Sequence, residues 1–233
     1  MRKILYLAAT VLLCASCFHV NSNFKGVHFG GKGTVKGEGP VLTKSFDLKD
    51  FDAITINGQA DVLFTQAETF EVTLRTQENI FDVVDYRVEG STLVIETQGK
   101  KTVQAEAYDL TIQAPTLKRL EVNGATDFRV PAGLTSDGDV KIEVNGAGDL
   151  NLSRISCATL GIQCNGAADV KALDIDVAKV DIQVNGAGDI RLSGTAGTAS
   201  LDVNGAGDVD ARDLAVAGEI KKHVAGLADI KLP

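Results

Sequence analysis

Residues 140–152 read VKIEVNGAGDLNL, and residues 180–192 repeat this stretch as VDIQVNGAGDIRL. Each copy alternates apolar and polar residues on both sides of an Asn-Gly-Ala-Gly-Asp pentad, and period-two alternation is typical of a β-strand with one buried face. Pentads and their variants begin at Asn57, Asn123, Asn145, Asn165, Asn185 and Asn204, and they end at Asp61, Asp127, Asp149, Asp169, Asp189 and Asp208. A worn copy occupies residues 225–229.

The interval between pentads decides between two β topologies. From Asn123 onward the pentads recur after 22, 20, 20 and 19 residues. Asn-Gly steps also favour a meander of antiparallel hairpins, but hairpins tolerate drifting strand lengths, whereas stacked coils need a near-constant interval. We therefore predict an all-β fold, a parallel β-solenoid with repeats of about 20 residues. The 66 residues between Asn57 and Asn123 have room for three further coils with diverged turns.

Stacked coils place equivalent residues about 4.8 Å apart, which predicts three features of the pentads. The Asn side chains form a ladder of bonded amides, and the glycines permit a positive φ at the corner. The Asp carboxylates repel one another unless each caps backbone N–H groups of its own turn or binds calcium. Because the spacing differs from the calcium-binding nonapeptide, we expect capping and no cofactor, with calcium as the alternative.

The first residues carry the features of a secretion signal. Arg2 and Lys3 precede an apolar run at residues 4–13, which is too short to span a membrane. Ala15-Ser16 before Cys17 resembles the bacterial lipobox, although Cys14 stands where that pattern has Leu. We predict a lipoprotein signal peptide at residues 1–16, lipid attachment at Cys17 and a flexible tether at 17–40. An ordinary signal peptide with a soluble secreted product is the alternative.

The remaining chain, residues 41–233, is predicted to be the solenoid body, with a less regular half at 41–115 and the regular pentads at 116–233. Lys and Arg number 23 against 31 Asp and Glu, which gives a formal charge of −8. A chain with this negative charge repels phosphate backbones, and nucleic acid is therefore excluded as a partner. Anionic membrane surfaces repel it too, and membrane attachment therefore depends on the acyl chains. Cys157 and Cys164 align with Val177 and Val184 one repeat later, which favours two buried thiols over one disulfide.

The pentads, the lead-in FDAITINGQADV at residues 51–62 and the strand GSTLVI at residues 90–95 resemble the head GIN domain family. This family is described as a "putative auto-transporter adhesin" and is otherwise of unknown function. The resemblance covers about residues 46–231. It implies an all-β, right-handed, solenoid-like body on bacterial envelope lipoproteins, and it implies no catalytic residues.

These features together predict a non-enzymatic, adhesin-like binding or scaffold module of the cell envelope. We expect a lipid anchor in the outer membrane, with the body facing either the periplasm or the cell surface. The partner would be a glycan, an envelope protein or a second copy of the chain. Outward strand residues would form the binding face, for example Glu143, Asp181, Gln183 and Arg191.

Two further expectations concern the alternatives and the last coil. Parallel β-helices also host polysaccharide lyases and hydrolases, and a cleft that gathers two carboxylates or His223 would favour such an enzyme. No catalytic constellation is recognisable in the sequence, so we assign no catalytic residue. Lys221, Lys222 and Lys231 lie in the final coil, and they predict protection of its open edge against pairing with other chains.

Overall fold

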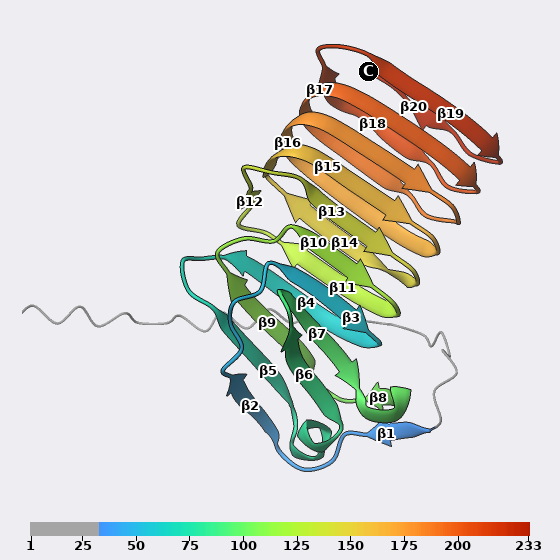
Figure 1. Ribbon diagram of the computed structural model, residues 1–233. Helices are drawn as coiled ribbons and strands as arrows, with labels where there is room; N and C mark the ends of the chain where they lie inside the picture. The colour runs from blue at the N-terminus through green and yellow to red at the C-terminus, as the bar shows by residue number, and fades with distance from the viewer. Residues whose placement is uncertain (1–32) are drawn as a thin grey trace, which may run out of the picture.

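The computed structural model describes residues 33–233, so the predictions for the signal peptide, Cys17 and most of the tether lie outside the described residues. The regular secondary structure of the described chain is β-strand, apart from two short 3₁₀ segments, η1 (Glu78–Asp82) and η2 (Gln98–Lys100). Parallel strands stack coil upon coil, which confirms the predicted all-β solenoid (Figure 1). Within residues 33–233, no helix is long and apolar enough to cross a membrane.

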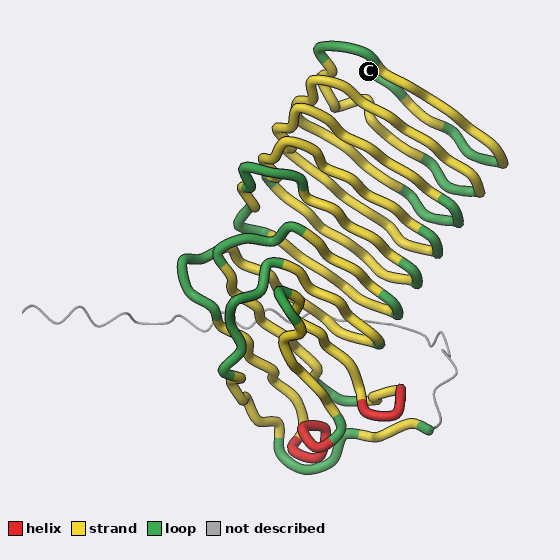
Figure 2. Tube along the Cα trace, viewed as in Figure 1, coloured by secondary structure: helices red, strands yellow, loops and turns green. Residues whose placement is uncertain are grey.

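Two long walls, here called wall A and wall B, form the solenoid. In spatial order, wall A contains β6 (Val84–Glu89), β7 (Thr92–Thr97), β3 (Ala53–Asn57), β10 (Arg119–Val122), β13 (Val140–Val144), the ends of β15 (Ile155–Cys164), β16 (Ala167–Val184) and β17 (Ile190–Gly205), and β19 (Ile220–Gly226). Wall B contains β2 (Val41–Phe46), β5 (Glu71–Gln77), β9 (Tyr108–Ala114), β4 (Gln59–Gln66), β11 (Ala125–Val130), β14 (Ala147–Ser153), the starts of β16 and β17, β18 (Val209–Val216) and β20 (Ile230–Lys231). The pentads turn the chain from wall A to wall B, and these turns stack along one side of the molecule (Figure 2).

A short third ladder, wall C, returns the chain from wall B to wall A. It starts with β12 (Leu134–Thr135), which pairs with the first residues of β15, and it continues through the middle of β16 and β17. The corner between walls B and C holds left-handed backbone at Gly133, Arg154, Asp174 and Gly194. At this corner the chain reverses which side chains face inward, and such a reversal needs an irregular backbone.

Alternation along the strands builds one continuous core. Ile142, Ile162 and Ile182 occupy the same register position in successive coils, and each is at most 3% exposed. Phe64 and Phe128 extend the core toward the N-terminal part, with ring centroids 6.3 Å apart. Each coil stacks only on the coils directly beside it, so the stability of one coil depends on the coils that flank it.

The segment between the first two pentads corrects one expectation. Asn57 and Asn123 lie in adjacent coils, because β3 pairs directly with β10 and Ile56 lies beside Val122. The intervening residues therefore do not form three diverged coils. They supply one layer, β7 and β9, on the other side of β3 and β4, and the antiparallel strands β2, β5 and β6 then cover that end.

The end of the predicted tether also differs from expectation. Residues 34–36 form strand β1, which pairs in parallel with β8 (Thr102–Gln104). Asn79 holds the next residues, because its Nδ2 donates to Lys36 O at 2.8 Å and its Oδ1 accepts from Glu38 N–H at 2.7 Å. Folded structure therefore begins before residue 41. The sequence did not show this, because β1 has only three residues and the polar contacts that hold the next residues come from Asn79, which is distant in the chain.

Candidate functional site

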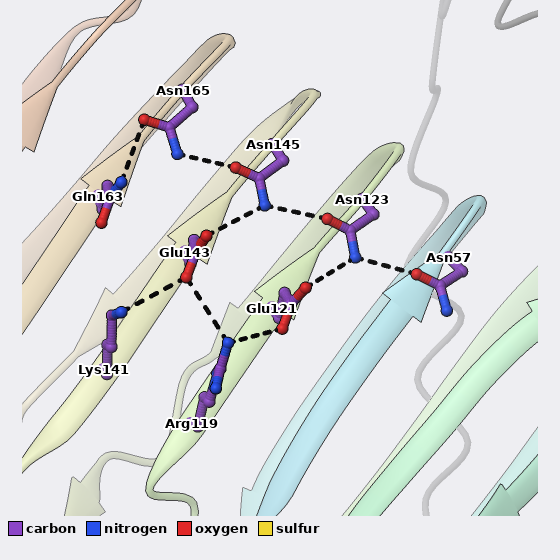
Figure 3. A network of polar contacts seen from close by, with 9 residues as sticks. All are labelled: Asn57, Arg119, Glu121, Asn123, Lys141, Glu143, Asn145, Gln163 and Asn165. Carbon is purple, nitrogen blue, oxygen red and sulfur yellow. Dashed lines mark hydrogen bonds and ion pairs between the residues drawn. The ribbon is translucent and has the colours of Figure 1, made fainter.

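The Asn residues of the pentads form the amide ladder expected from the sequence (Figure 3). Asn123 Nδ2 donates to Asn57 Oδ1 at 3.0 Å, and the same bond repeats upward through the coils. The later bonds are 3.0, 2.8, 3.0 and 3.4 Å long, and they involve Asn145, Asn165, Asn185 and Asn204. The ladder ends where Ala225 takes the Asn position of the last coil.

In the five pentads from Asn123 to Asn204 the first glycine serves close coil stacking, whereas the expected positive φ is found at Gly58, in the first pentad, and at the second glycine Gly148. Gly146, Gly166, Gly186 and Gly205 have no positive φ. A Cβ added to Gly166 would instead overlap the carbonyl oxygen of Gly146 in the coil below. That same oxygen accepts the Ala167 N–H at 2.8 Å, so the backbone bond between coils and a side chain compete for one space. Glycine is therefore required by the neighbouring coil.

Three of the six pentad aspartates bond to the next coil, and not to their own turns as expected. Asp169 Oδ1 accepts the Asp189 N–H at 3.1 Å, and Asp189 Oδ1 accepts the Asp208 N–H at 3.1 Å. Asp208 Oδ1 accepts the Asp229 N–H at 3.0 Å in the same way. The expectation that each aspartate caps its own turn was wrong, because the stacked coils place the backbone N–H of one pentad aspartate beside the carboxylate of the aspartate in the preceding coil. A charged acceptor makes such a bond stronger than one between neutral groups.

At the other end of this aspartate column the carboxylates are more enclosed. Asp61 lies in register between Asp109 and Asp127, and Asp127 is 8% exposed. Asp127 Oδ2 pairs with Arg129 at 3.2 Å, but among the described residues its Oδ1 has no partner. Burial, followed by the Asp127 charge, raises the pKa of Asp61 to about 6. Burial and the charges of Asp127 and Asp169 also raise the pKa of Asp149.

The aspartate column does not assemble a metal centre in the structure. Among residues 33–233, no group of three or more His, Cys, Asp or Glu side chains is arranged to hold a metal ion. A hard cation such as calcium takes six to eight oxygen ligands, whereas the column supplies one carboxylate per coil. The bonds from Asp169, Asp189 and Asp208 to the next coil also occupy carboxylate oxygens that a cation would need.

The outer surface of wall A, here called the wall A face, is polar and interconnected (Figure 3). Arg119 pairs with Glu121 at 2.8 Å and lies 3.7 Å from Glu143, and Lys141 lies 3.5 Å from Glu143. Asn145 Nδ2 donates to Glu143 Oε1 at 3.3 Å, which joins the charged residues to the amide ladder. The stacked strands fix the spacing of these groups, so the face is a rigid array of donors and acceptors.

Gly161 opens a hollow in this face. It occupies the outward position between Lys141 and Asp181 in adjacent coils, where the missing side chain leaves a space of about 280 Å³. The polar side chains that line the hollow are Asp139, Lys141, Thr159, Gln163, Asp181 and Gln183. The hollow is about the size of one small ligand unit, and residues with amide, hydroxyl, carboxylate and ammonium groups line it.

Two carboxylates line this hollow, which is the feature that would favour the enzyme alternative. Asp181 Oδ2, however, forms an ion pair with Lys179 Nζ at 2.8 Å. Glycoside hydrolysis by paired carboxylates needs both groups free to act on the substrate, and this ion pair engages one oxygen of Asp181 with a lysine instead. His223 is exposed on β19 in the last coil, in register with Asp202, and does not line the hollow.

The structure separates the residues that the sequence placed on one face. Glu143, Asp181 and Gln183 lie on wall A, but Arg191 lies on wall B and pairs with Asp213 at 3.0 Å. Sequence reasoning missed the central residue of the hollow, Gly161. Its signal was present, because the equivalent position carries a charged side chain in both flanking coils.

Cys157 and Cys164 are both free and buried, which confirms two buried thiols. They lie beside Val177 and Val184 in the next coil, as the repeat alignment indicated. Burial raises the pKa of each thiol to about 11, so neither is a reactive thiolate at neutral pH. Both therefore act as small core residues.

Several solved structures share this fold. A "putative adhesin" of Bacteroides fragilis has a TM-score of 0.72 and 21% identity, and the alignment covers 85% of this chain and 100% of that one. A "putative adhesin" of Parabacteroides distasonis has a TM-score of 0.75 and 24% identity over 84% of each chain. A "putative lipid binding protein" of the same species has a TM-score of 0.72 and 22% identity, over 86% of this chain and 99% of that one.

Below 25% identity these structures support the fold alone. A search of curated proteins gave no match. Residues 50–232, by contrast, match the sequence family described as "Putative auto-transporter adhesin, head GIN domain". The match takes in the lead-in at residues 51–62 and every pentad, which are the segments that build walls A and B. The chain therefore belongs to the head GIN domain family.

Proposed function

We propose that this chain is a lipid-anchored, non-enzymatic binding module of the bacterial envelope, and that it binds a saccharide through the hollow at Gly161. The hollow carries the proposal, because it is a concave site on an otherwise regular wall. Membership of an adhesin-described family supports a binding role. The proposed anchor rests on the signal sequence and Cys17.

The lining of the hollow favours a polyol ligand. Gln163 and Gln183 stack in register and offer both amide donors and acceptors, and Thr159 adds a hydroxyl. Hydroxyl groups on a sugar ring need donors and acceptors of this kind, and the ring of one monosaccharide suits about 280 Å³. One structural relative is described as lipid binding, but amides and charges suit hydroxyl groups better than an acyl chain.

Filling the hollow tests this proposal. A Cβ at Gly161 would meet only the Val140 carbonyl oxygen, at 4.0 Å, so Gly161→Gln projects into the hollow with the backbone undisturbed. We expect this variant to lose at least about tenfold in saccharide affinity, because the side chain occupies the ligand's place. Binding is measured on an array of oligosaccharides that contain hexoses, N-acetylhexosamines and uronic acids.

The matched control is Ser200→Gln, which adds the same side chain in the same outward column beyond Asp181 and outside the lining of the hollow. It should bind as the unchanged chain does. Equal binding by Gly161→Gln, or no saccharide bound by the unchanged chain, would contradict the proposed site. Repeating the assay in a chelator tests the calcium alternative, since loss of binding there would reveal a required cation.

The anchor is tested separately. We expect cells fed labelled palmitate to label the chain, and Cys17→Ser to abolish the label, because the thiol is the predicted attachment point. Protease treatment of intact cells, with lysed cells as the control, then locates the body. Loss of the body from intact cells supports adhesion to external glycans, and protection until lysis contradicts an adhesin role.

A further inference from the structure

The two ends of the solenoid are finished differently. At the N-terminal end, the antiparallel strands β2, β5 and β6 lie beyond the last parallel layer. At the other end, β19 and β20 each pair on one side only, with β17 and β18, among residues 33–233 (Figure 1). Their free sides present backbone N–H and C=O groups, and such an edge is a template for another strand.

The last coil also carries apolar surface. Ile220, Val224, Ala228 and Leu232 pack against the core but are only partly buried, and Leu227 is 90% exposed. In the preceding coil the residues in register with Ile220 and Val224 are Ala199 and Val203, and both are buried. Leu227, by contrast, lies at an outward turn position that is also exposed in earlier coils. An uncovered apolar layer beside an unpaired strand edge is the combination through which β-proteins associate end to end.

One residue in this coil breaks the core pattern. The inward position of wall A is occupied by an aliphatic side chain, at most 3% exposed, in seven successive parallel strands, namely Leu93, Ile54, Leu120, Ile142, Ile162, Ile182 and Leu201. In the last coil the residue in register is Lys222. Among residues 33–233, lysine therefore replaces the aliphatic side chain only in the coil on which no other coil is stacked.

Lys222 makes a specific contact at this end. Its Nζ donates to Ile230 O at 2.8 Å, so the side chain reaches from β19 in wall A to β20 in wall B. An ammonium group thus lies over the open end of the core. A further coil or strand stacked on this end would bury the charge, and an unpaired buried charge is strongly unfavourable.

We propose that Lys222 closes the C-terminal edge of the solenoid to a second copy of this chain. Without that charge, two edges related by a two-fold axis can pair β19 with β19 in antiparallel fashion and cover each other's apolar layer. Lys221 and Lys231 lie on the same coil but occupy outward register positions, so a stacked copy would not bury their charges. The inward lysine is the element that blocks burial.

The test replaces Lys222 by Leu in the full chain and measures protein mass by light scattering in detergent, with the detergent contribution subtracted. We expect the Lys222→Leu protein to be at least roughly twice the mass of the unchanged protein at about 100 µM, and to return to it on dilution. Lys221→Leu is the matched control, because it removes the same charge and adds the same apolar side chain on the outward side of the same strand.

Three outcomes would overturn the proposal: equal masses for Lys222→Leu and the unchanged protein, equal association by Lys221→Leu, or an unchanged protein that already pairs through this edge. Lys222→Met retains most of the stem length without the charge, so it should also associate. It serves as the second variant if Lys222→Leu does not fold, and circular dichroism establishes folding for each protein.

Discussion

Replacing Gly166 by Ala is expected to lower the free energy of unfolding by about 3 kcal/mol, the upper end of what overpacking usually costs. The added methyl group overlaps the carbonyl oxygen of Gly146, which is backbone and cannot rotate away as a side chain would. Relief requires the two coils to separate, and separation weakens the Ala167 N–H bond to Gly146 and the amide bond from Asn165 to Asn145. Urea unfolding followed by circular dichroism measures the change.

Gly161→Ala provides a matched control on the preceding strand, because the nearest atom to its Cβ is the Val140 carbonyl oxygen, at 4.0 Å. This control should be as stable as the unchanged chain or slightly more so, since glycine inside a strand weakens it. If Gly166→Ala were equally stable, coil contact would not be the reason for glycine in the pentad. A positive φ at that site is already excluded by the structure.

The regular half of the fold followed from the sequence because its determinants repeat. Near-constant pentad intervals specified parallel coils, and alternation specified which residues are buried, such as Ile162 and Ile182. The amide ladder also followed, since identical residues in register must meet. To predict these features, one needs only the local alternation of residues and the distance between stacked coils.

The features that failed depend on contacts that do not repeat. No repeated motif at residues 67–118 shows that this segment forms one layer with antiparallel covering strands, because antiparallel pairing joins partners such as Phe46 and Val72, which are distant in the chain and share no motif. The pentad aspartates were assigned the wrong amide, because own-turn and next-coil N–H groups are indistinguishable without coordinates. Asp189 accepts from Asp208 in the next coil.

The candidate site was predictable from the sequence only in part. Lys141, Gln163 and Asp181 were predictably outward-facing, and the repeat alignment placed them in adjacent coils. The hollow arises from one absent side chain at Gly161, and its significance depends on the size of the neighbours. Lys222 was recognised as an edge residue, but its inward orientation and its bond to Ile230 O required the register of the last coil.

Asp61→Asn is expected to stabilise the chain by about 2 kcal/mol at pH 7 and hardly at all at pH 4. Burial and the neighbouring Asp127 raise the pKa of Asp61 from its ordinary 3.8 to about 6, so the folded chain holds this proton more tightly than the unfolded chain does. The charged groups that face Asp61 are Asp109 on β9, with its partner Arg75 on β5, and Asp127 and Arg129 on β11. An amide at position 61 removes a charge and can donate to the unpartnered Asp127 Oδ1.

The sign follows from proton binding. Between pH about 4 and about 6 the folded state binds more protons at Asp61 than the unfolded state, so the free energy of unfolding falls as pH rises through this range. The amide in the Asp61→Asn variant does not titrate, so the difference between variant and unchanged chain should grow from pH 4 to pH 6 and stay constant above pH 7. Thermal and urea unfolding at these pH values measure it.

Asp189→Asn is the control from the same column, because Asp189 is exposed and an amide oxygen can still accept the Asp208 N–H. Its effect should be about 0.5 kcal/mol or less at both pH values. A pH-independent gain in Asp61→Asn would assign the effect to the new hydrogen bond alone. Equal gains in both variants would assign it to the net charge of the column, because Asp61, unlike Asp189, is enclosed between Asp109 and Asp127.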